Sequence, residues 1–368
     1  MTRKPDGPLR KGWTTGACAT AATRAAWQAI LSGAFPDPVG ITLPRGETPQ
    51  FALVKKETGP GWARASIIKD AGDDPDVTHQ AEIIATVRQA STGAGISFHA
   101  GAGVGTITKP GLPLPVGEPA INPKPREMMT VQILELAAEF GVRPDVEIEI
   151  SIPGGAEIAQ KTWNPRLGII GGLSVLGTTG VVIPFSCSAW IHSIHRGVDV
   201  ARATGRHHVA GATGKTSESA IKAIYGLPDE ALLDMGDFVG GMLKYLRRNP
   251  VPNVTIAGGF GKLVKLAQGH LDLHSSRSQV DMEKLAHTAA AIGADTALCD
   301  AIRTANTARH VLELCAAQSV DIGNIIARQA RETAMATIDG ACAIEIVIFD
   351  RQGGMVGRAG RLETPSSP

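Results

Sequence analysis

The chain has 368 residues, of which 43% are hydrophobic and 19% are charged, and its formal net charge is +1. This composition is typical of a globular protein of about two domains, and it excludes attraction to nucleic acid by overall charge. The sequence contains no apolar run of about 18 residues, so we expect no membrane span.

The five cysteines of the chain are scattered, and none forms a CxxC pair. This usage favours a reducing cytoplasm and disfavours a disulfide framework or a zinc site. The first residues, MTRKPDGPLRKGW, lack the apolar core of a signal peptide. We therefore expect a cytoplasmic protein without a bound metal, and the sequence leaves open whether it forms a homo-oligomer. The cysteines are Cys18, Cys187, Cys299, Cys315 and Cys342.

Residues 1–163 predict a mixed α+β domain. A helix is expected from Gly16, with Thr14 or Thr15 as its N-cap and Gly33 just past its end. A second helix is expected in NPKPREMMTVQILELAAEFG, with Gly141 at its end. Short apolar runs predict strands. They lie at 41–43, 51–55, 63–68, 83–88, 96–99, 104–108 and 145–153.

Residues 164–368 predict an α/β domain, because short apolar strands alternate with helical stretches. We expect a doubly wound, mostly parallel sheet of Rossmann-like character. The last residues, GRAGRLETPSSP, are expected to be disordered. The expected strands are GVVIPFS, HHVAGA, ALLDMG, NVTIAGG and AIEIVIFD, and the expected helical stretches are 187–204, 215–225, 237–248 and 260–337.

Two glycine turns, GATGK and GGFGK, each follow a strand and place a lysine in the first turn of a helix. Ligands of doubly wound sheets bind at the carboxyl ends of the strands. A cation near a helix N-terminus is disfavoured by about 0.3–1 kcal/mol unless an anion is present. Lys215 and Lys262 therefore predict a carboxylate site, although simple solvation of both ammonium groups stays open. A nucleotide P-loop is disfavoured, because Val209 occupies the place of its first glycine.

The stretch KDAGDDPDVTHQAEI places Asp70, Asp73, Asp74, Asp76 and His79 in one acidic loop between strands. Its spacing does not match an EF-hand. Neighbouring carboxylates repel one another unless they meet a cation or are well solvated, which favours a ligand bearing positive charge or hydroxyl groups. The alternative is that the aspartates only form turns.

Histidines His270 and His274 lie four residues apart in GHLDLHSSRS. This spacing can bind a metal on a helix, but the HExxH glutamate and a third ligand are both missing. Hydrogen bonding to a substrate or to the backbone is therefore favoured over metal binding.

Several stretches of the chain together resemble the CbiD family of cobalt-precorrin-5B C(1)-methyltransferases. The resemblance runs from about residue 9 to residue 357, and it departs from the family at Gln80, where a glycine is expected. It implies S-adenosylmethionine as methyl donor, a cobalt-bound ring-contracted tetrapyrrole as acceptor, and a two-domain α/β architecture. The stretches are LRKGWTTGACATAA, DAGDDPDVTHQAEI, GAGVGTITKPGLPLPVGEPAINPKPR, GGLSVLGTTG, AGGFGKLVKLAQGHLDLHSSRS and GACAIEIVIFD.

The resemblance also suggests a use for the charged motifs. Acetate and propionate arms make an early corrinoid a polyanion, which suits the glycine turns, and the positive donor suits the acidic loop. We expect substrate binding by Lys109, Gly214, Lys215, Gly258, Gly259, Gly261, Lys262 and His270. We expect donor binding by Thr14, Thr15, Gly16, Asp76, Gly171, Gly172, Thr178 and Thr179, and catalytic roles for Asp70, Asp74 and His79. Two alternatives remain at this point, a nucleotide-dependent kinase or ATPase and a non-catalytic tetrapyrrole-binding protein.

Overall fold

The computed structural model describes residues 7–362 and divides the chain into two compact units, Met1–Cys187 and Ser188–Pro368. The sequence instead predicts a division at residue 163. The boundary lies later because two short strands after that point pair within the first unit. β10 (Ile169–Ile170) pairs with β8 (Thr106–Ile107), and β11 (Val181–Val182) pairs with β1 (Gly12–Trp13).

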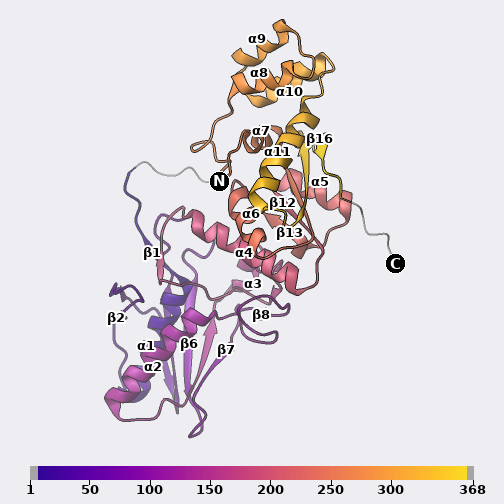
Figure 1. Cartoon of the computed structure of the whole chain (residues 1–368). Helices are drawn as coiled ribbons and strands as arrows, with labels where there is room; N and C mark the ends of the chain where they lie inside the picture. Colours follow the sequence, from indigo (N-terminus) through magenta and orange to yellow (C-terminus); the bar gives the residue numbers. More distant parts are fainter. Residues whose placement is uncertain (1–6, 363–368) are drawn as a thin grey trace. The chain divides into compact units, whose positions relative to one another are not determined.

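The first unit is built on a five-stranded sheet of order β4-β5-β6-β9-β7, in which only the β7–β9 pair is parallel. Its two long helices, α1 and α2, pack against each other, and α1 also packs on β5 and β6 (Figure 1). The other elements of the first unit are α1 (Thr15–Ser32), β2 (Val39–Gly40), β3 (Gln50–Phe51), β4 (Lys56–Gly59), β5 (Trp62–Ile68), β6 (Glu82–Gln89), β7 (Ile96–Ala100), α2 (Pro123–Phe140), β9 (Val146–Ser151) and α3 (Gly155–Ala159).

The small side chains of α1 explain its burial on several sides. Alanines occupy most of its inner positions and are fully buried, so the helix can approach both the sheet and α2 closely. Thr14 caps the helix with its hydroxyl, and Gly33 ends it with a positive φ of 78°. The predicted ends of α1 are therefore confirmed, as is the end of α2 at Gly141.

The second unit holds a five-stranded sheet of order β13-β12-β14-β15-β16, with the first four strands parallel and β16 antiparallel at the edge. The predicted α/β class is confirmed. The elements of this unit are α4 (Cys187–Ala203), β12 (His208–Ala212), α5 (Lys215–Tyr225), a 3-10 turn (Asp229–Ala231), β13 (Leu232–Asp234), α6 (Val239–Arg248), β14 (Asn253–Gly259), α7 (Phe260–Ala267), α8 (Met282–Ala290), α9 (Thr296–Thr304), α10 (Ala308–Ala317), α11 (Ile322–Ile338), β15 (Ala343–Phe349) and β16 (Met355–Ala359).

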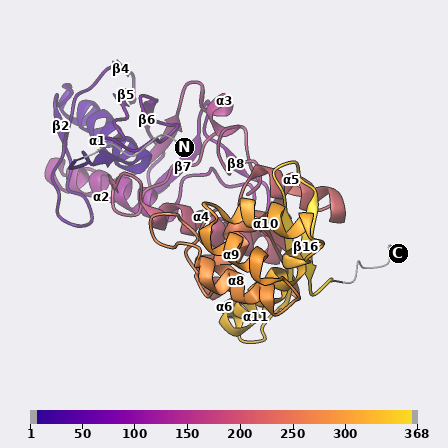
Figure 2. The same ribbon diagram turned by 90° about the horizontal axis from the view of Figure 1, so that it is seen from above.

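Helices cover both faces of this sheet. One apolar cluster joins α5 to one face, and a larger cluster joins α4, α6, α7 and α11 to the other. Figure 2 shows α5 on the opposite side of the sheet from α6 and α11. The helices α8, α9 and α10 form a small group that packs against α7 and α11. The carboxyl ends of β12, β13 and β14 consequently meet at one edge, which we call the C-terminal edge.

Several local predictions differ from the structure. The strands expected at 41–43, 51–55, 104–108 and 180–186 shrink to two-residue pairs or shift by a few residues, because glycines and prolines interrupt them. Part of the tail expected to be disordered forms β16 instead, where Arg358 pairs with the buried Glu345 on β15 at 2.7 Å. The rest of that prediction, residues 363–368, lies outside the described residues.

Candidate functional site

Three stretches singled out in the sequence meet at the N-terminus of α1. The backbone N–H of Trp13 donates to the carbonyl of Asp70 at 2.7 Å, which places the acidic loop beside the start of the helix. Thr14 donates to Gly180 at 2.9 Å, and Gly16 donates to Leu176 at 2.8 Å. The structure thus brings together the TTG turn, the acidic loop and the GTTG segment, which are far apart in sequence.

The residues at the start of α1 are used internally. The Thr14 hydroxyl accepts from the N–H of Ala17 at 3.1 Å, and Thr15 is buried. A Cβ at Gly16 would lie 2.8 Å from Pro125 and 2.9 Å from the Leu176 carbonyl, so no side chain fits there. These residues hold the surrounding loops in place, and the N–H groups of Gly16 and Ala17 already have protein acceptors.

Arg10 neutralises the first part of the acidic loop. Its guanidinium donates to both carboxylate oxygens of Asp70, with Nη2 at 2.9 Å from Oδ1, and its backbone N–H donates to Asp73 at 2.6 Å. The hydrogen bond from Arg10 lowers the pKa of Asp70 below its usual value. Asp70 is therefore a carboxylate that already has a cation, which argues against its predicted catalytic role.

Lys69 neutralises the second part of the loop from inside the unit. Its side chain is only 3% exposed, and its ammonium donates to Asp76 and to the Thr78 hydroxyl. Asp76 also accepts from the N–H of Thr78 at 2.7 Å. Burial opposes ionisation of Asp76, but the charge and the hydrogen bonds of Lys69 and Thr78 prevail and lower its pKa. Asp76 is thus committed to a buried ion pair.

Asp74 differs from Asp70 and Asp76, which are in ion pairs, and from Asp73, which is exposed. It is half-buried, and its Oδ1 accepts from the backbone N–H of Phe185 at 2.8 Å. Among residues 7–362 it has no ion pair. Burial raises the pKa of Asp74, and the neighbouring charge of Asp76 adds to this, while the bond from Phe185 opposes it. Asp74 is the carboxylate of the loop best suited to meet an external cation.

His79 is exposed, and its Nδ1 accepts from the backbone N–H of Ala71 at 3.1 Å. Because a backbone N–H can only donate, Nδ1 is the acceptor in this contact. The next residue, Gln80, has a positive φ of 66°, the left-handed conformation that favours glycine. This explains physically why a glycine is expected there in the resembling family.

The predicted donor-binding residues between Gly171 and Thr179 include both packed and exposed members. A Cβ at Gly172 would lie 2.2 Å from the backbone of Gly103, so this glycine permits a close approach of two chain segments. The Thr179 hydroxyl lies 3.2 Å from the carbonyl of Val181, to which it donates. Gly171 and Thr178 are exposed, and the stem of Lys109 lies over Gly168.

In the second unit, the two glycine turns and Asp237 share the C-terminal edge. The Lys262 ammonium donates to the carbonyl of Thr213 at 2.9 Å and pairs with Asp237 Oδ1 at 3.0 Å. Gly258 packs tightly, since a Cβ there would lie 2.2 Å from Leu263. Lys262 therefore links the strand ends to one another, and its charge is already compensated.

Lys215 has the opposite character at the same edge. It is exposed, and it has no hydrogen bond or ion pair among residues 7–362. An added Cβ would meet no atom within 4 Å at Gly214 or Gly259, and only Ala308 at 3.6 Å at Gly261. The edge beside Lys215 is thus open to a ligand.

His270 follows α7, and its backbone N–H donates to the carbonyl of Lys265 at 2.9 Å. Its side chain is half-buried. Among residues 7–362, no three His, Cys, Asp or Glu side chains are arranged to hold a metal ion.

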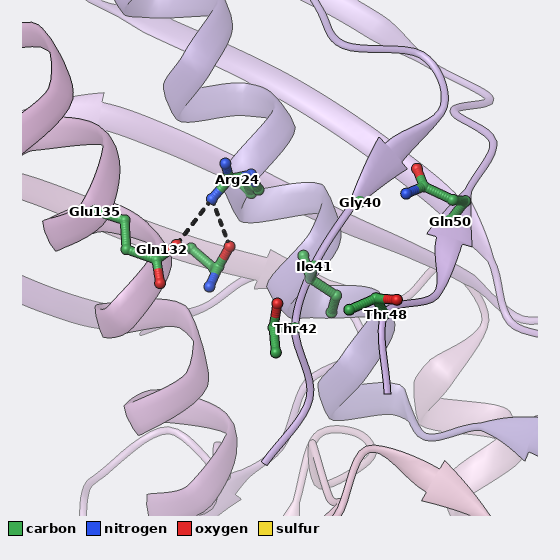
Figure 3. Close-up of a pocket in the computed structure, with 8 residues that line it drawn as sticks. All are labelled: Arg24, Gly40, Ile41, Thr42, Thr48, Gln50, Gln132 and Glu135. Carbon is green, nitrogen blue, oxygen red and sulfur yellow. Dashed lines mark hydrogen bonds and ion pairs between the residues drawn. The ribbon is translucent and has the colours of Figure 1, made fainter. Parts of the chain in front are cut away.

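A separate hollow of about 240 Å³ lies in the first unit between α1, α2 and the β2–β3 hairpin (Figure 3). Arg24 reaches across it from α1 to Gln132 at 2.7 Å and to Glu135 at 3.1 Å on α2. None of the predicted site residues lines this hollow, and the charge of Arg24 is compensated by Glu135. We therefore describe two candidate regions, the acidic loop in the first unit and the C-terminal edge in the second unit.

Sequence reasoning missed Arg10, Lys69 and Asp237. Their ion pairs determine which charged side chains of the acidic loop and of the C-terminal edge remain available to a ligand. Arg10 lies in LRKGWTTGACATAA and Lys69 begins KDAGDDPDVTHQAEI, so their basic character is visible in the sequence. The sequence does not show that Arg10 pairs with Asp70, because the two residues lie 60 positions apart. Asp237 follows the strand ALLDMG directly, and its position after a strand is the signal that could have found it.

Comparisons with known proteins place the chain in a family. The CbiD family model matches residues 2–184, and the model of the CbiD C-terminal domain matches residues 272–360.

Among residues 7–362, every helix is too short or too polar to cross a lipid bilayer.

Curated relatives match over nearly the whole chain. The cobalt-precorrin-5B C(1)-methyltransferase of Paramagnetospirillum magneticum is 62% identical over 95% of this chain and 98% of its own length. The enzyme of the same name from Brucella anthropi is also 62% identical, over 95% of each chain. The solved structure of cobalamin biosynthesis protein cbiD from Archaeoglobus fulgidus is 29% identical, covers 74% of this chain and 84% of that chain, and has a TM-score of 0.40. The chain belongs to the CbiD family.

Proposed function

We propose that this chain is a cobalt-precorrin-5B C(1)-methyltransferase. It transfers a methyl group from S-adenosylmethionine to carbon 1 of cobalt-precorrin-5B and yields cobalt-precorrin-6A in anaerobic cobalamin biosynthesis. The observation that carries the proposal is the 62% identity to two enzymes of this name over 95% of the chain. Its five cysteines are all free thiols, which fits a cytoplasmic enzyme.

The first unit has a group that fits the methyl donor. S-adenosylmethionine supplies an activated methyl on a positive sulfonium, and it also carries an ammonium group and ribose hydroxyls. Asp74 is a half-buried carboxylate without an ion pair among residues 7–362, so a cation beside it would relieve the cost of its burial. We therefore assign Asp74 to the donor, and we assign Asp70 and Asp76 to holding the loop around it.

The second unit has groups that fit the acceptor. Its arms are carboxylates, and a lysine in a glycine turn offers them a charge together with nearby backbone N–H groups. Lys215 is exposed at the C-terminal edge and lacks a partner among residues 7–362, whereas Lys262 is held by Asp237. Lys215 is therefore the arm-binding residue of the pair, and Lys262 shapes the edge.

The reaction needs no nucleophilic side chain. Holding two reactants in the geometry of attack contributes roughly 7–11 kcal/mol to the lowering of a barrier. The role of the protein is to bind, align and exclude water, and charged groups such as Asp74 and Lys215 are suited to binding and aligning the two reactants.

A labelling experiment tests the proposal. The protein is incubated with S-adenosylmethionine carrying ¹³C in its methyl group and with cobalt-precorrin-5B, and the product is examined by NMR. We expect the label at carbon 1. Binding of the tetrapyrrole without transfer would indicate a carrier, transfer to another carbon would change the assigned reaction, and Mg²⁺-dependent ATP hydrolysis would indicate a nucleotide enzyme. The names of the relatives support neither a carrier nor an ATPase.

A further inference from the structure

The loop between α7 and α8 belongs to the C-terminal edge. The N–H of Leu273 donates to the carbonyl of Asp237 at 2.9 Å, and the N–H of Gly240 donates to the carbonyl of Leu271 at 2.9 Å. Asp237 is the partner of Lys262, which in turn holds Thr213. Residues 272–279, which we call the serine loop, therefore begin directly beside the two glycine turns.

The serine loop has a fixed shape. Asp272 Oδ1 accepts from the N–H of His274 at 3.1 Å and so closes a turn at its start. The N–H groups of Arg277 and Ser278 both donate to the carbonyl of His274, at 2.9 and 3.0 Å. Ser278 is buried, whereas the four residues before it are exposed. The turn is therefore organised before any ligand binds, which lowers the entropic cost of binding.

The exposed residues of the serine loop are hydrogen-bond donors. His274 Nδ1 accepts from the N–H of Ser276 at 3.2 Å and lies 2.7 Å from its hydroxyl. A backbone N–H can only donate, so the neutral ring of His274 carries its proton on Nε2, the nitrogen turned away from this contact. Arg277 is 62% exposed and pairs with Asp272 at 3.3 Å. An exposed ion pair of this kind contributes about 0–1 kcal/mol, so the guanidinium can turn to another carboxylate.

A buried lysine anchors the loop. The side chain of Lys265 on α7 is buried, yet its ammonium donates to the carbonyl of Leu273 at 2.9 Å. Burying an ammonium group is costly unless it is well bonded. The bond to the carbonyl of Leu273, the residue before His274, supplies this ammonium with an acceptor. Lys265 thus fixes where the serine loop leaves the edge.

We propose that the serine loop is a second carboxylate-binding element for the acceptor, in which His274 and Arg277 contact one of its arms. Lys265 acts as a positioning residue through Leu273. The inference rests on the proposed function insofar as the acceptor is a macrocycle with acetate and propionate arms. Together with Lys215 it supplies contacts from separate segments of the edge, as recognition of a ligand with several arms requires.

The test compares Arg277→Ala and His274→Ala with a matched control, Arg309→Ala. Arg309 on α10 is 57% exposed and pairs with Glu313 at 2.7 Å, so it matches Arg277 in exposure and in having a carboxylate partner. Cobalt-precorrin-5B is titrated against each variant. We expect the acceptor Kd to rise about 10-fold or more for Arg277→Ala and about 3- to 10-fold for His274→Ala. The acceptor Kd of the control and the donor Kd of every variant should stay within twofold of the wild-type values. An unchanged acceptor Kd in both loop variants overturns the proposal.

Lys265→Met tests the positioning role, because it keeps the stem and removes the donor to Leu273. We expect its acceptor KM to rise while its donor KM and kcat at saturating acceptor stay near wild type, a split that general loosening of the unit would not produce. Equal losses for both substrates would refute the positioning role. If Lys265→Met does not fold, the two loop variants still decide the main proposal.

The same variants separate this inference from the proposed function. If the wild-type protein methylates carbon 1 and the loop variants bind acceptor normally, only the serine loop assignment fails. If the wild-type protein transfers no methyl group, uroporphyrin, a macrocycle with acetate and propionate arms, replaces the acceptor as probe. Weaker uroporphyrin binding by Arg277→Ala than by Arg309→Ala then supports the loop, and equal binding refutes it.

Discussion

The acidic loop of the first unit and the C-terminal edge of the second unit use charge in different ways. The acidic loop gathers Arg10 and Lys69 from its surroundings, and these cations pair with Asp70 and Asp76. Asp73 accepts from the backbone N–H of Arg10, and Asp74 accepts from that of Phe185. At the C-terminal edge, Lys262 is paired with Asp237, whereas Lys215 is exposed and has no partner among residues 7–362. The acidic loop keeps one half-buried carboxylate, Asp74, without an ion pair among residues 7–362, whereas the C-terminal edge presents an exposed cation to a ligand.

The comparison shows that a charged side chain in a sequence motif is available to a ligand only if no neighbouring charge already pairs with it. A run of aspartates suggests a strongly negative site, but Asp70 and Asp76 are already held in ion pairs that stabilise the loop. Two lysines in matching glycine turns suggest equal roles, but only one of them is open to a ligand. Substitutions at paired residues should therefore lower stability, and substitutions at Asp74 and Lys215 should lower affinity.

The largest effect is expected at Asp76. Asp76→Ala leaves the buried ammonium of Lys69 without its carboxylate, and breaking a buried pair costs about 3–5 kcal/mol. Asp73→Ala is the control, because Asp73 is exposed and its carboxylate accepts, within residues 7–362, only from the N–H of Arg10. Its cost should stay below about 1 kcal/mol. Urea denaturation measures both. Equal losses in the two variants would show that Asp76 is no more important than its exposed neighbour.

At the C-terminal edge, substitutions of the two lysines should differ in their effect on the free energy of unfolding. Lys262→Met removes the cation from Asp237, whose side chain is only 15% exposed, and should cost about 1–3 kcal/mol of unfolding free energy. Lys215→Met should change it by about 0.5 kcal/mol or less, since Lys215 is exposed. If the two variants unfold at the same urea concentration, the distinction between a structural and a ligand-binding lysine is wrong.

Local sequence signals predict part of this fold well. The cap at Thr14 and the glycines Gly33 and Gly141 mark helix ends, because capping depends on a few adjacent residues. The alternation of strands and helices in the second half predicts the parallel sheet. The domain boundary is not predicted, because the pairing of β11 with β1 joins segments about 170 residues apart. The same limit applies to the candidate site, where Arg10 and Asp237 act on distant partners.

A moderate effect is expected at Asp74. Asp74→Asn keeps an oxygen that can accept from Phe185 but removes the negative charge, so the donor Kd should rise about 10-fold. The raised pKa of Asp74 means that the wild-type carboxylate protonates at a higher pH than an ordinary aspartate. Donor affinity of the wild-type protein should therefore fall as the pH is lowered through that pKa, and the variant should lack this step. Calorimetric titration at several pH values tests both statements; a pH step that persists in Asp74→Asn assigns it to another group.

The smallest effect is expected at Gln80. Its positive φ of 66° is costly for a side chain other than glycine, so Gln80→Gly should raise the free energy of unfolding by about 0.5–1 kcal/mol. Ser97→Gly in β7 is a suitable contrast, because glycine in a strand lowers stability. A loss of stability in Gln80→Gly would show that the side chain of Gln80 contributes more than its backbone strain costs.

The central claim is that an open cation at the C-terminal edge binds a carboxylate arm of the acceptor. It is tested most directly by titrating cobalt-precorrin-5B against Lys215→Ala and Lys222→Ala. Both lysines are on α5, but Lys222 lies in its last turn and pairs with Asp229. We predict an acceptor Kd about 10-fold higher for Lys215→Ala and unchanged for Lys222→Ala. Equal affinity in the two variants would contradict the claim.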